Sequence, residues 1–336
     1  MRYLKSMKSI TEIQNFEGKR VLLRVDWNVP VRDGEVLDPE RIDNSLATIN
    51  YILDRGGKIL IVSHITKEGE SLKPAFEYFG SKVPAVFCDD LEAIPEAKLV
   101  VLENIRKWEG EKKNEEDFAE KLASKAELYV NDAFSESHRA YASIIGVPKL
   151  LPSYAGIYFM EEYQNLSKAL SPAHPFIFIL GGAKFETKIP LIEKFLKVAD
   201  QVFVLGAIAK PASETELVNN PKINLPVGDV AALDANQETL EVLNLKITNS
   251  KFILWNGPLG KYEEGLTEGT KKLALMLSEI CASGQAEVVV GGGDTLAVIK
   301  ELGIKDKFTF VSSSGGAMLD FLATGTLPGI EALNSV

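Results

Sequence analysis

Short apolar runs alternate with longer amphipathic segments along the 336-residue chain. In the first half the apolar runs predict strands at residues 20–28, 58–65, 85–90, 99–106 and 127–134. In the second half they predict strands at 176–182, 201–206, 252–257, 287–293 and 308–316. Strands that alternate with helices favour a parallel sheet covered on both faces. We therefore predict an α/β protein with two doubly wound, Rossmann-like parallel-sheet domains.

Helical spacing joins these strands. Residues 41–56 and 114–126 have the period of amphipathic helices, and Asn114 is predicted to cap the second one because three acidic residues follow it. Residues 155–170 also have helical spacing and suit a hinge helix. The predicted organisation is a first domain at 1–154, a linking helix at 155–172 and a second domain at 173–319.

Polar residues and glycines end the predicted strands. In open parallel sheets ligands bind beyond the carboxyl ends of the strands, so these residues are the candidates for a site. The first half offers donors and charges: Asp26, Asn28, His64, Asn104, Arg106, Asn131 and Asp132, followed by His138 and Arg139. The second half offers mainly bare backbone: Gly181, Gly182, Gly206, Asn256, Gly257, Gly291, Gly292, Gly293, Asp294, Gly315 and Gly316. This division suits a small acid in one domain and nucleotide phosphates in the other.

Each local motif also has a structural interpretation. Asp26 could cap its own loop and Arg41 could pair with Glu40 at the surface, although polar residues directly after an apolar run favour a site. Lys184 and Lys188 have the spacing that places two side chains on one face of a helix. The GGGDT turn at 291–295 could be a tight turn or a phosphate site. It has neither the lysine of GxxxxGK[ST] nor the pattern GxGxxG, which argues against a dinucleotide-dependent dehydrogenase.

Composition narrows the function classes. A net charge of −10 argues against non-specific binding to nucleic acid or membranes. Cys88 and Cys281 are too few and too far apart for a disulfide framework or a metal site. The sequence shows no long apolar segment, which predicts a cytoplasmic protein. All eight arginines precede residue 140, at positions 2, 20, 24, 32, 41, 55, 106 and 139.

Nine motifs in order resemble the phosphoglycerate kinase family over nearly the whole chain. They are RVDWNVP, SLKP, ENIR, NDAFSESHRAYAS, LGGAKFETK, WNGPLG, GGGDT, SSSGGA and LPGIEAL. The resemblance implies a first domain that binds 3-phosphoglycerate or 1,3-bisphosphoglycerate and a second that binds Mg²⁺ with ATP or ADP. It also implies a tail at 320–336 that returns to the first domain, domain closure during the reaction, and a monomer.

The resemblance also implies roles for residues at matching positions. The phosphoglycerate ligands would be Asp26, Asn28, Arg41, His64, Lys67, Arg106 and Arg139. The nucleotide ligands would be Lys184, Lys188, Gly206, Asn256, Glu263, Gly291, Gly292, Gly293, Asp294 and Thr295, and Asp294 would also hold the metal. The catalytic groups would be Arg41, Lys188, Gly292 and Gly315.

Three departures from the family pattern bear on activity. SHITKEG stands where the family has SHLGRP, so we expect Lys67 to take the place of an arginine. This change keeps the positive charge but loses the planar guanidinium. Thr187 stands where the family has an aspartate. Residues 207–231 replace a much longer segment that helps form the adenine pocket. These departures keep open an alternative in which the chain binds phosphoglycerate or nucleotide as a sensor or scaffold.

Overall fold

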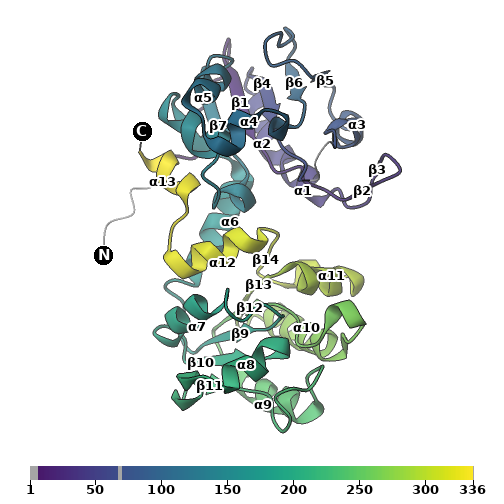
Figure 1. Ribbon diagram of the computed structural model, residues 1–336, viewed down its shortest axis with the longest axis vertical. Helices are drawn as coiled ribbons and strands as arrows, with labels where there is room; N and C mark the ends of the chain where they lie inside the picture. The colour runs from purple at the N-terminus through teal and green to yellow at the C-terminus, as the bar shows by residue number, and fades with distance from the viewer. Residues whose placement is uncertain (1–6, 67–69, 336) are drawn as a thin grey trace. The chain divides into compact units, whose positions relative to one another are not determined.

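The computed structural model describes residues 7–66 and 70–335, which form two compact units. The first unit comprises the described residues of Met1–Tyr163 and Thr326–Val336, and the second comprises Gln164–Gly325. The chain passes from one unit to the other within helix α6 (Ile157–Lys168), and it passes back after Gly325 (Figure 1).

The first unit is built on a six-stranded sheet in which every pairing is parallel. In the order in which they lie side by side, its strands are β5 (Val86–Cys88), β6 (Leu99–Leu102), β4 (Lys58–Val62), β1 (Arg20–Arg24), β7 (Leu128–Asn131) and β8 (Ser153–Ala155). The residues of β6 and β7 are all buried, as expected for strands covered on both faces. A two-stranded hairpin, β2 (Val31–Arg32) and β3 (Glu35–Val36), follows β1.

Helices and short turns of helix surround this sheet. The α-helices are α1 (Glu40–Asn44), α2 (Leu46–Leu53), α3 (Lys73–Gly80), α4 (Glu109–Lys113), α5 (Glu116–Ala123), the first part of α6, and α13 (Pro328–Asn334). The 3₁₀ and π turns are η1 (Ile10–Glu12), η2 (Ile105–Lys107), η3 (Phe134–Glu136), η4 (Ala142–Gly146) and η5 (Val147–Lys149). The C-terminal helix α13 contacts η4, and the Gly329 N–H donates to the Ser137 carbonyl at 2.8 Å.

Two helix predictions in this unit were wrong in detail. The helix predicted at 41–56 is interrupted at Ser45, whose hydroxyl donates to the Ile42 carbonyl and so competes with the helix backbone. Asn114 does not cap α5 at its N-terminus. It ends α4 in the left-handed conformation, with φ of 51°, which asparagine tolerates better than most residues.

The second unit repeats the same architecture. From one edge to the other its parallel strands are β11 (Ile223–Asn224), β10 (Gln201–Val204), β9 (Phe176–Leu180), β12 (Phe252–Asn256), β13 (Glu287–Gly291) and β14 (Phe310–Ser312). The α-helices are the end of α6, α7 (Ile189–Leu196), α8 (Ala209–Ser213), α9 (Gln237–Ile247), α10 (Glu268–Ala282), α11 (Gly293–Glu301) and α12 (Gly315–Thr324). The 3₁₀ turns are η6 (Gly206–Ile208), η7 (Glu216–Asn219), η8 (Tyr262–Glu264) and η9 (Lys305–Lys307).

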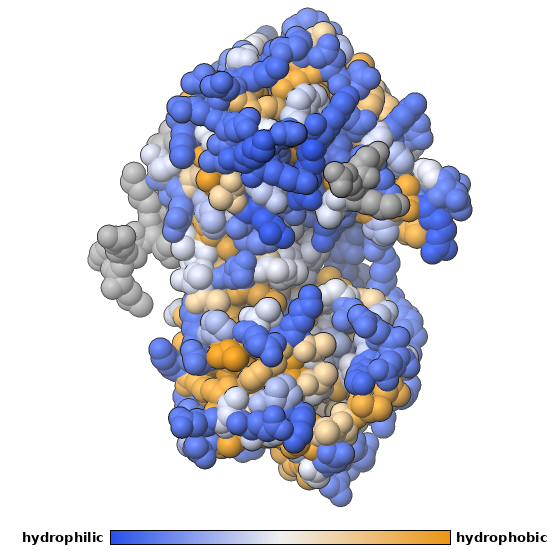
Figure 2. Space-filling model, viewed as in Figure 1, coloured by the Kyte–Doolittle hydropathy of each residue, from blue (hydrophilic) through white to orange (hydrophobic). Residues whose placement is uncertain are grey.

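The predicted fold class is confirmed, since both sheets are parallel and helices connect their strands. The edge strands β8 and β11 were not predicted, because they are only three and two residues long and have no apolar run. On the face in view, the surface of the first unit is mainly hydrophilic, and more apolar surface is visible on the second (Figure 2). No helix in residues 7–66 and 70–335 is long and apolar enough to cross a membrane.

Candidate active site

In the first unit the order of the strands reverses around β1. The chain goes from β1 to β4 on one side of the sheet and later adds β7 and β8 on the other side, so the connections that leave β1 and β7 run toward opposite edges of the sheet. Ligands of open α/β sheets bind at such a point. Asp26 lies two residues beyond β1 and His64 two residues beyond β4, which brings them together at this edge.

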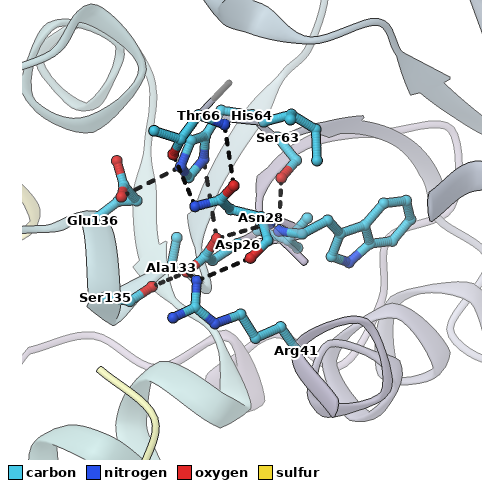
Figure 3. A network of polar contacts seen from close by, with 12 residues as sticks. Asp26, Asn28, Arg41, Ser63, His64, Thr66, Ala133, Ser135 and Glu136 are labelled. Atoms are coloured by element: carbon cyan, nitrogen blue, oxygen red, sulfur yellow. Dashed lines mark hydrogen bonds and ion pairs between the residues drawn. The ribbon is translucent and has the colours of Figure 1, made fainter. Parts of the chain in front are cut away.

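The side chains at this edge form one hydrogen-bonded group, which we call the polar cluster. Its members are Asp26, Asn28, Arg41, His64, Thr66, Arg106, Ser135 and Glu136. Figure 3 shows its centre, where Asp26 lies between the side chains of Arg41, Ser135 and His64.

Asp26 is the anchor of Arg41. An Arg41 Nη1–H donates to Asp26 Oδ2 at 2.8 Å, and the hydroxyl of Ser135 donates to the same oxygen. Burial raises the pKa of Asp26, but the charge of Arg41 and the hydrogen bond from Ser135 act against it, and the pKa lies below its usual value. Asp26 is therefore an ionised, almost fully buried carboxylate that fixes a half-exposed guanidinium.

Asn28, Thr66 and Arg106 are linked in series. The Asn28 amide donates to Thr66 Oγ1 at 2.8 Å and accepts from the Thr66 N–H at 3.0 Å. Arg106 Nη1–H donates to Thr66 Oγ1 at 3.1 Å. These bonds hold a guanidinium and an amide side by side, which is a suitable arrangement for binding a carboxylate or phosphate.

His64 lies at the buried base of the cluster. Its Nδ1 is 3.3 Å from Nη2 of Arg24, and its Nε2 is 3.3 Å from Oε1 of Glu136. A guanidinium only donates, so Nδ1 accepts and the ring proton is on Nε2, directed at Glu136. Burial lowers the pKa of His64 despite the neighbouring carboxylates, which makes the neutral ring the expected form.

Arg24 is linked through Ser143 to a second buried acid, Glu111. Its Nε–H donates to Ser143 Oγ at 2.9 Å, and Ser143 donates through its hydroxyl and its N–H to the carboxylate of Glu111 at 2.6 and 2.9 Å. Arg24 and Glu111 are both completely buried. Burial raises the pKa of Glu111, although Arg24 acts against this.

Two of the predicted phosphoglycerate ligands need separate mention. Lys67 lies outside the described residues, so its predicted role is not tested by the structure. Arg139 is exposed on the loop after η3, and its side chain makes no hydrogen bond or ion pair within residues 7–66 and 70–335.

The second unit has a pocket of about 410 Å³ at the corresponding edge of its sheet, between the loops that follow β9 and β12. Its lining residues are Gly182, Ala183, Lys184, Thr187, Lys188, Asn256, Gly257, Pro258, Glu263, Gly292, Gly293, Asp294, Gly315 and Leu319. Helices α11 and α12 both begin at this pocket with a glycine. A helix start presents unpaired N–H groups and the positive end of the helix dipole.

The amides at the start of α11 have no partner within the helix. The first intrahelical bond runs from the Leu296 N–H to the Gly292 carbonyl at 2.9 Å. Gly292 has φ of 102°, and a Cβ there would lie 3.1 Å from the Gly257 nitrogen. Only glycine suits both the conformation and the space, which lets the turn between β13 and α11 pack closely against the loop after β12.

The two lysines of the pocket differ from the prediction. They do not share a helix face, because α7 begins at Ile189, after both of them, with Pro190 in its first turn. Lys184 is exposed, whereas Lys188 is 7% exposed and its ammonium donates to the Gly181 carbonyl. Burial lowers the pKa of Lys188 to about 8, although Asp294 acts against this.

Three further residues predicted as nucleotide ligands do not line the pocket. A Cβ on Gly206 would lie 2.9 Å from the Pro258 carbonyl oxygen, and one on Gly291 would lie 2.1 Å from Met318 Sδ, so both glycines allow close packing. Thr295 is completely buried, and its hydroxyl has no hydrogen-bond partner among the described residues.

The chain was compared with known proteins. The sequence model of the family described as phosphoglycerate kinase matches residues 10–219 and 210–325. The chain belongs to this family. The phosphoglycerate kinase of Wolbachia sp. subsp. Drosophila simulans is 36% identical over 393 aligned positions, covering 97% of this chain and 98% of that protein. The corresponding protein of Finegoldia magna is 35% identical, covering 95% and 97%.

Solved structures agree with this assignment. A phosphoglycerate kinase structure from Coxiella burnetii has a TM-score of 0.86 at 28% identity and covers 98% of this chain and 99% of that one. One from Pyrococcus horikoshii has a TM-score of 0.83 at 26% identity, with 98% of both chains covered. The chain is accordingly a phosphotransferase of glycolysis and gluconeogenesis that moves a phosphoryl group between 1,3-bisphosphoglycerate and ADP. Nothing in these comparisons favours the sensor or scaffold alternative.

Sequence reasoning missed several residues of the site. Arg24, Thr66, Ser135 and Glu136 were not predicted, although each contacts a residue that was. The sequence gives a weak signal for Glu136, because it adjoins the predicted His138 and Arg139 within SESHRAYAS. For Arg24 there is none, since a charged residue at the end of an apolar run is usually exposed.

Proposed function

We propose that the polar cluster of the first unit binds 3-phosphoglycerate and that the glycine-lined pocket of the second unit binds the phosphates of ATP or ADP. The observation that carries this proposal is the pocket itself. Lys184, Lys188 and the glycine starts of two helices converge on about 410 Å³ of space, which provides charge and backbone donors for a polyphosphate. In the first unit, Arg41, Arg106 and Asn28 offer the donors that suit a small organic acid.

In this proposal the catalytic groups act by neutralising and aligning charge. The acceptor for phosphate in the reverse direction is a carboxylate, which is ionised at about pH 7, so the reaction needs no general base. Arg41 is assigned to the carboxyl group that carries the phosphate, and Lys188, Gly292 and Gly315 are assigned to the transferred group on the nucleotide. Such preorganised donors act mainly in the transition state.

Mg²⁺ would be held at Asp294. This carboxylate is exposed at the start of α11 and lines the pocket. Within the described residues no group of three His, Cys, Asp or Glu side chains could hold a metal unaided. One carboxylate fits Mg²⁺ that arrives with a nucleotide, because this ion is usually bound by one or two carboxylates together with phosphate oxygens. When bound, it would neutralise phosphate charge.

The shortened segment at 207–231 is proposed to weaken recognition of the base. It folds as η6, α8, η7 and the edge strand β11, and none of these four elements lines the phosphate pocket. In η8, the exposed acid Glu263 does line this pocket, and we assign it to the ribose. Binding energy would come mainly from the phosphates. We therefore expect less than roughly a hundredfold preference for ATP over GTP in kcat/KM, or ~2.7 kcal/mol.

Steady-state kinetics with 3-phosphoglycerate, Mg²⁺ and a panel of nucleoside triphosphates tests the proposal. Arg41→Ala should lower kcat by about 10²- to 10³-fold and leave binding of MgATP alone nearly unchanged. Arg55→Ala is the control, because Arg55 is only partly buried and stacks on Tyr51 away from the polar cluster. Near-normal kcat in folded Arg41→Ala would contradict the assignment of Arg41. Binding of both ligands by the native protein without turnover would support the sensor reading.

The proposed form in solution is a monomer, with both ligand sites on one chain. Sedimentation velocity of the purified protein tests this directly, and a concentration-independent species near the 36.8 kDa of the chain is expected.

A further inference from the structure

Glu136 places a negative charge among the groups that would receive an anionic substrate. It is the last residue of η3, and its carboxylate is 12% exposed. Arg106 Nη2–H donates to Glu136 Oε2 at 2.8 Å, while His64 Nε2 lies 3.3 Å from Oε1 (Figure 3 shows the His64 contact). Two of the proposed phosphoglycerate ligands therefore already face a carboxylate of the protein.

This carboxylate is ionised over the whole physiological range. Burial raises the pKa of Glu136, but the adjacent His64 ring and the charges of Arg24 and Arg106 outweigh it and hold the pKa at about 2. The hydrogen bond that Arg106 donates to this carboxylate is consequently charge-assisted, which makes it stronger than a neutral hydrogen bond. An anion that approaches the same donors meets both an occupied site and a like charge.

Glu136 is more easily displaced than the other acid of the cluster. Asp26 is held by Arg41, by Ser135 and by the N–H of Asn28, all on a short side chain. Glu136 has one more rotatable bond, and within the described residues no backbone N–H donates to its carboxylate. His64 is completely buried, so its Nε2–H can reach a ligand only if the carboxylate of Glu136 moves away.

We propose that Glu136 is an internal counter-ion that the anionic group of the substrate must displace from Arg106 and His64, and that it thereby sets the affinity and selectivity of the polar cluster. The idea rests on the proposed function of this cluster. A ligand that carries both a carboxylate and a phosphate can replace the lost contacts and still bind elsewhere in the cluster. A simple inorganic anion gains only the contacts that Glu136 gives up, so the residue discriminates against it.

The test compares the native protein with Glu136→Gln, which keeps the size and one acceptor oxygen but removes the charge. Glu109→Gln is the matched control, since Glu109 is exposed, lies outside the cluster and pairs only with Lys113 among the described residues. We expect the Kd and KM for 3-phosphoglycerate to fall about tenfold in Glu136→Gln, with kcat within about twofold. Inhibition by inorganic sulfate should strengthen at least as much, and Glu109→Gln should match the native protein.

Unchanged or weaker binding of 3-phosphoglycerate and sulfate by Glu136→Gln would overturn the inference, because Glu136 would then support the donors rather than compete for them. If the native protein does not bind 3-phosphoglycerate, the proposed function fails, and the sulfate measurements alone decide the role of Glu136. Should Glu136→Gln not fold, Glu136→Asp decides. Its shorter carboxylate is drawn back from Arg106, so tighter sulfate binding supports the inference and unchanged binding contradicts it.

Discussion

Replacing Lys188 by methionine should make the protein more stable and nearly inactive. Lys188 is 7% exposed, and burial lowers the pKa of its ammonium from 10.5 to about 8. Keeping this buried group charged costs free energy, because the unfolded chain binds the proton more tightly than the folded protein does. Methionine has a similar length and no charge, and it fills the same space.

The size of the effect follows from the two pKa values. At about pH 7 the difference between 10.5 and about 8 corresponds to roughly 3 kcal/mol of destabilisation in the native protein. The cost is fully present below the folded pKa and declines as the pH rises toward the unfolded pKa. At about pH 9.5 roughly 1.5 kcal/mol is left. The stability advantage of Lys188→Met should thus shrink by roughly 1.5 to 2 kcal/mol between these conditions.

Loss of the hydrogen bond from Lys188 to the Gly181 carbonyl opposes the gain, and any change in this bond on deprotonation is already contained in the two pKa values. The difference between the two conditions is therefore the quantity to measure. Because a chain with two units need not unfold in one step, we would use proteolysis in graded urea and locate the cleavage sites in residues 164–325 by mass spectrometry. The assay uses the nucleotide-free protein.

Lys184→Met is the control for this measurement. Lys184 lines the same pocket but is exposed, so its loss should not give a pH-dependent change in stability. In Lys188→Met, kcat should fall about 10²- to 10³-fold. An equal stability difference at both pH values, or an advantage that grows with pH, would refute the account of Lys188 as a buried charge.

Two further predictions concern stability at other positions. Burial raises the pKa of Asp132 to about 6 from 3.8, so the stability of the native protein should fall as the pH rises through this range. Relative to the native protein, the free energy of unfolding of Asp132→Asn should rise by about 2 kcal/mol between about pH 4.5 and about pH 7.5, as measured by proteolysis in graded urea with cleavage sites located in the first unit. Gly292→Ala should cost roughly 1 to 3 kcal/mol because of its positive φ. Gly293→Ala meets nothing within 4 Å and should stay stable, although calorimetry should show weaker nucleotide binding.

The sequence was sufficient to predict the α/β class, the parallel sheets and a helix between the two halves. These features depend on local patterns: apolar runs too continuous for a half-exposed strand, and helical spacing between them. Prediction failed where a side chain competes with the helix backbone, as at Ser45, or where a strand is only two residues long, as in β11.

The members of the site could be found only partly. Residues that directly follow a strand, such as Asp26 and His64, can be identified from the sequence because strand ends meet at one edge of a parallel sheet. Arg24 could not, because its burial depends on Ser143, which is 119 residues away in the sequence. The different exposure of Lys184 and Lys188 was likewise not predictable from a four-residue spacing, since Pro190 delays the start of α7.

Some charged side chains that the sequence did not identify are buried in the fold, as is a lysine that is central to the proposed mechanism. Arg24, Glu111 and Lys188 are charged side chains that the fold buries at a cost in stability. Buried charges are rarely retained for stability alone, since apolar residues of similar size are often as stable or more so. In this chain each of them holds, or itself is, a donor at the edge of a sheet: Arg24 fixes the tautomer of His64, and Lys188 adjoins the amides of the phosphate pocket. In the proposed mechanism, the stability lost at these positions would provide the fixed electrostatic environment that phosphoryl transfer requires.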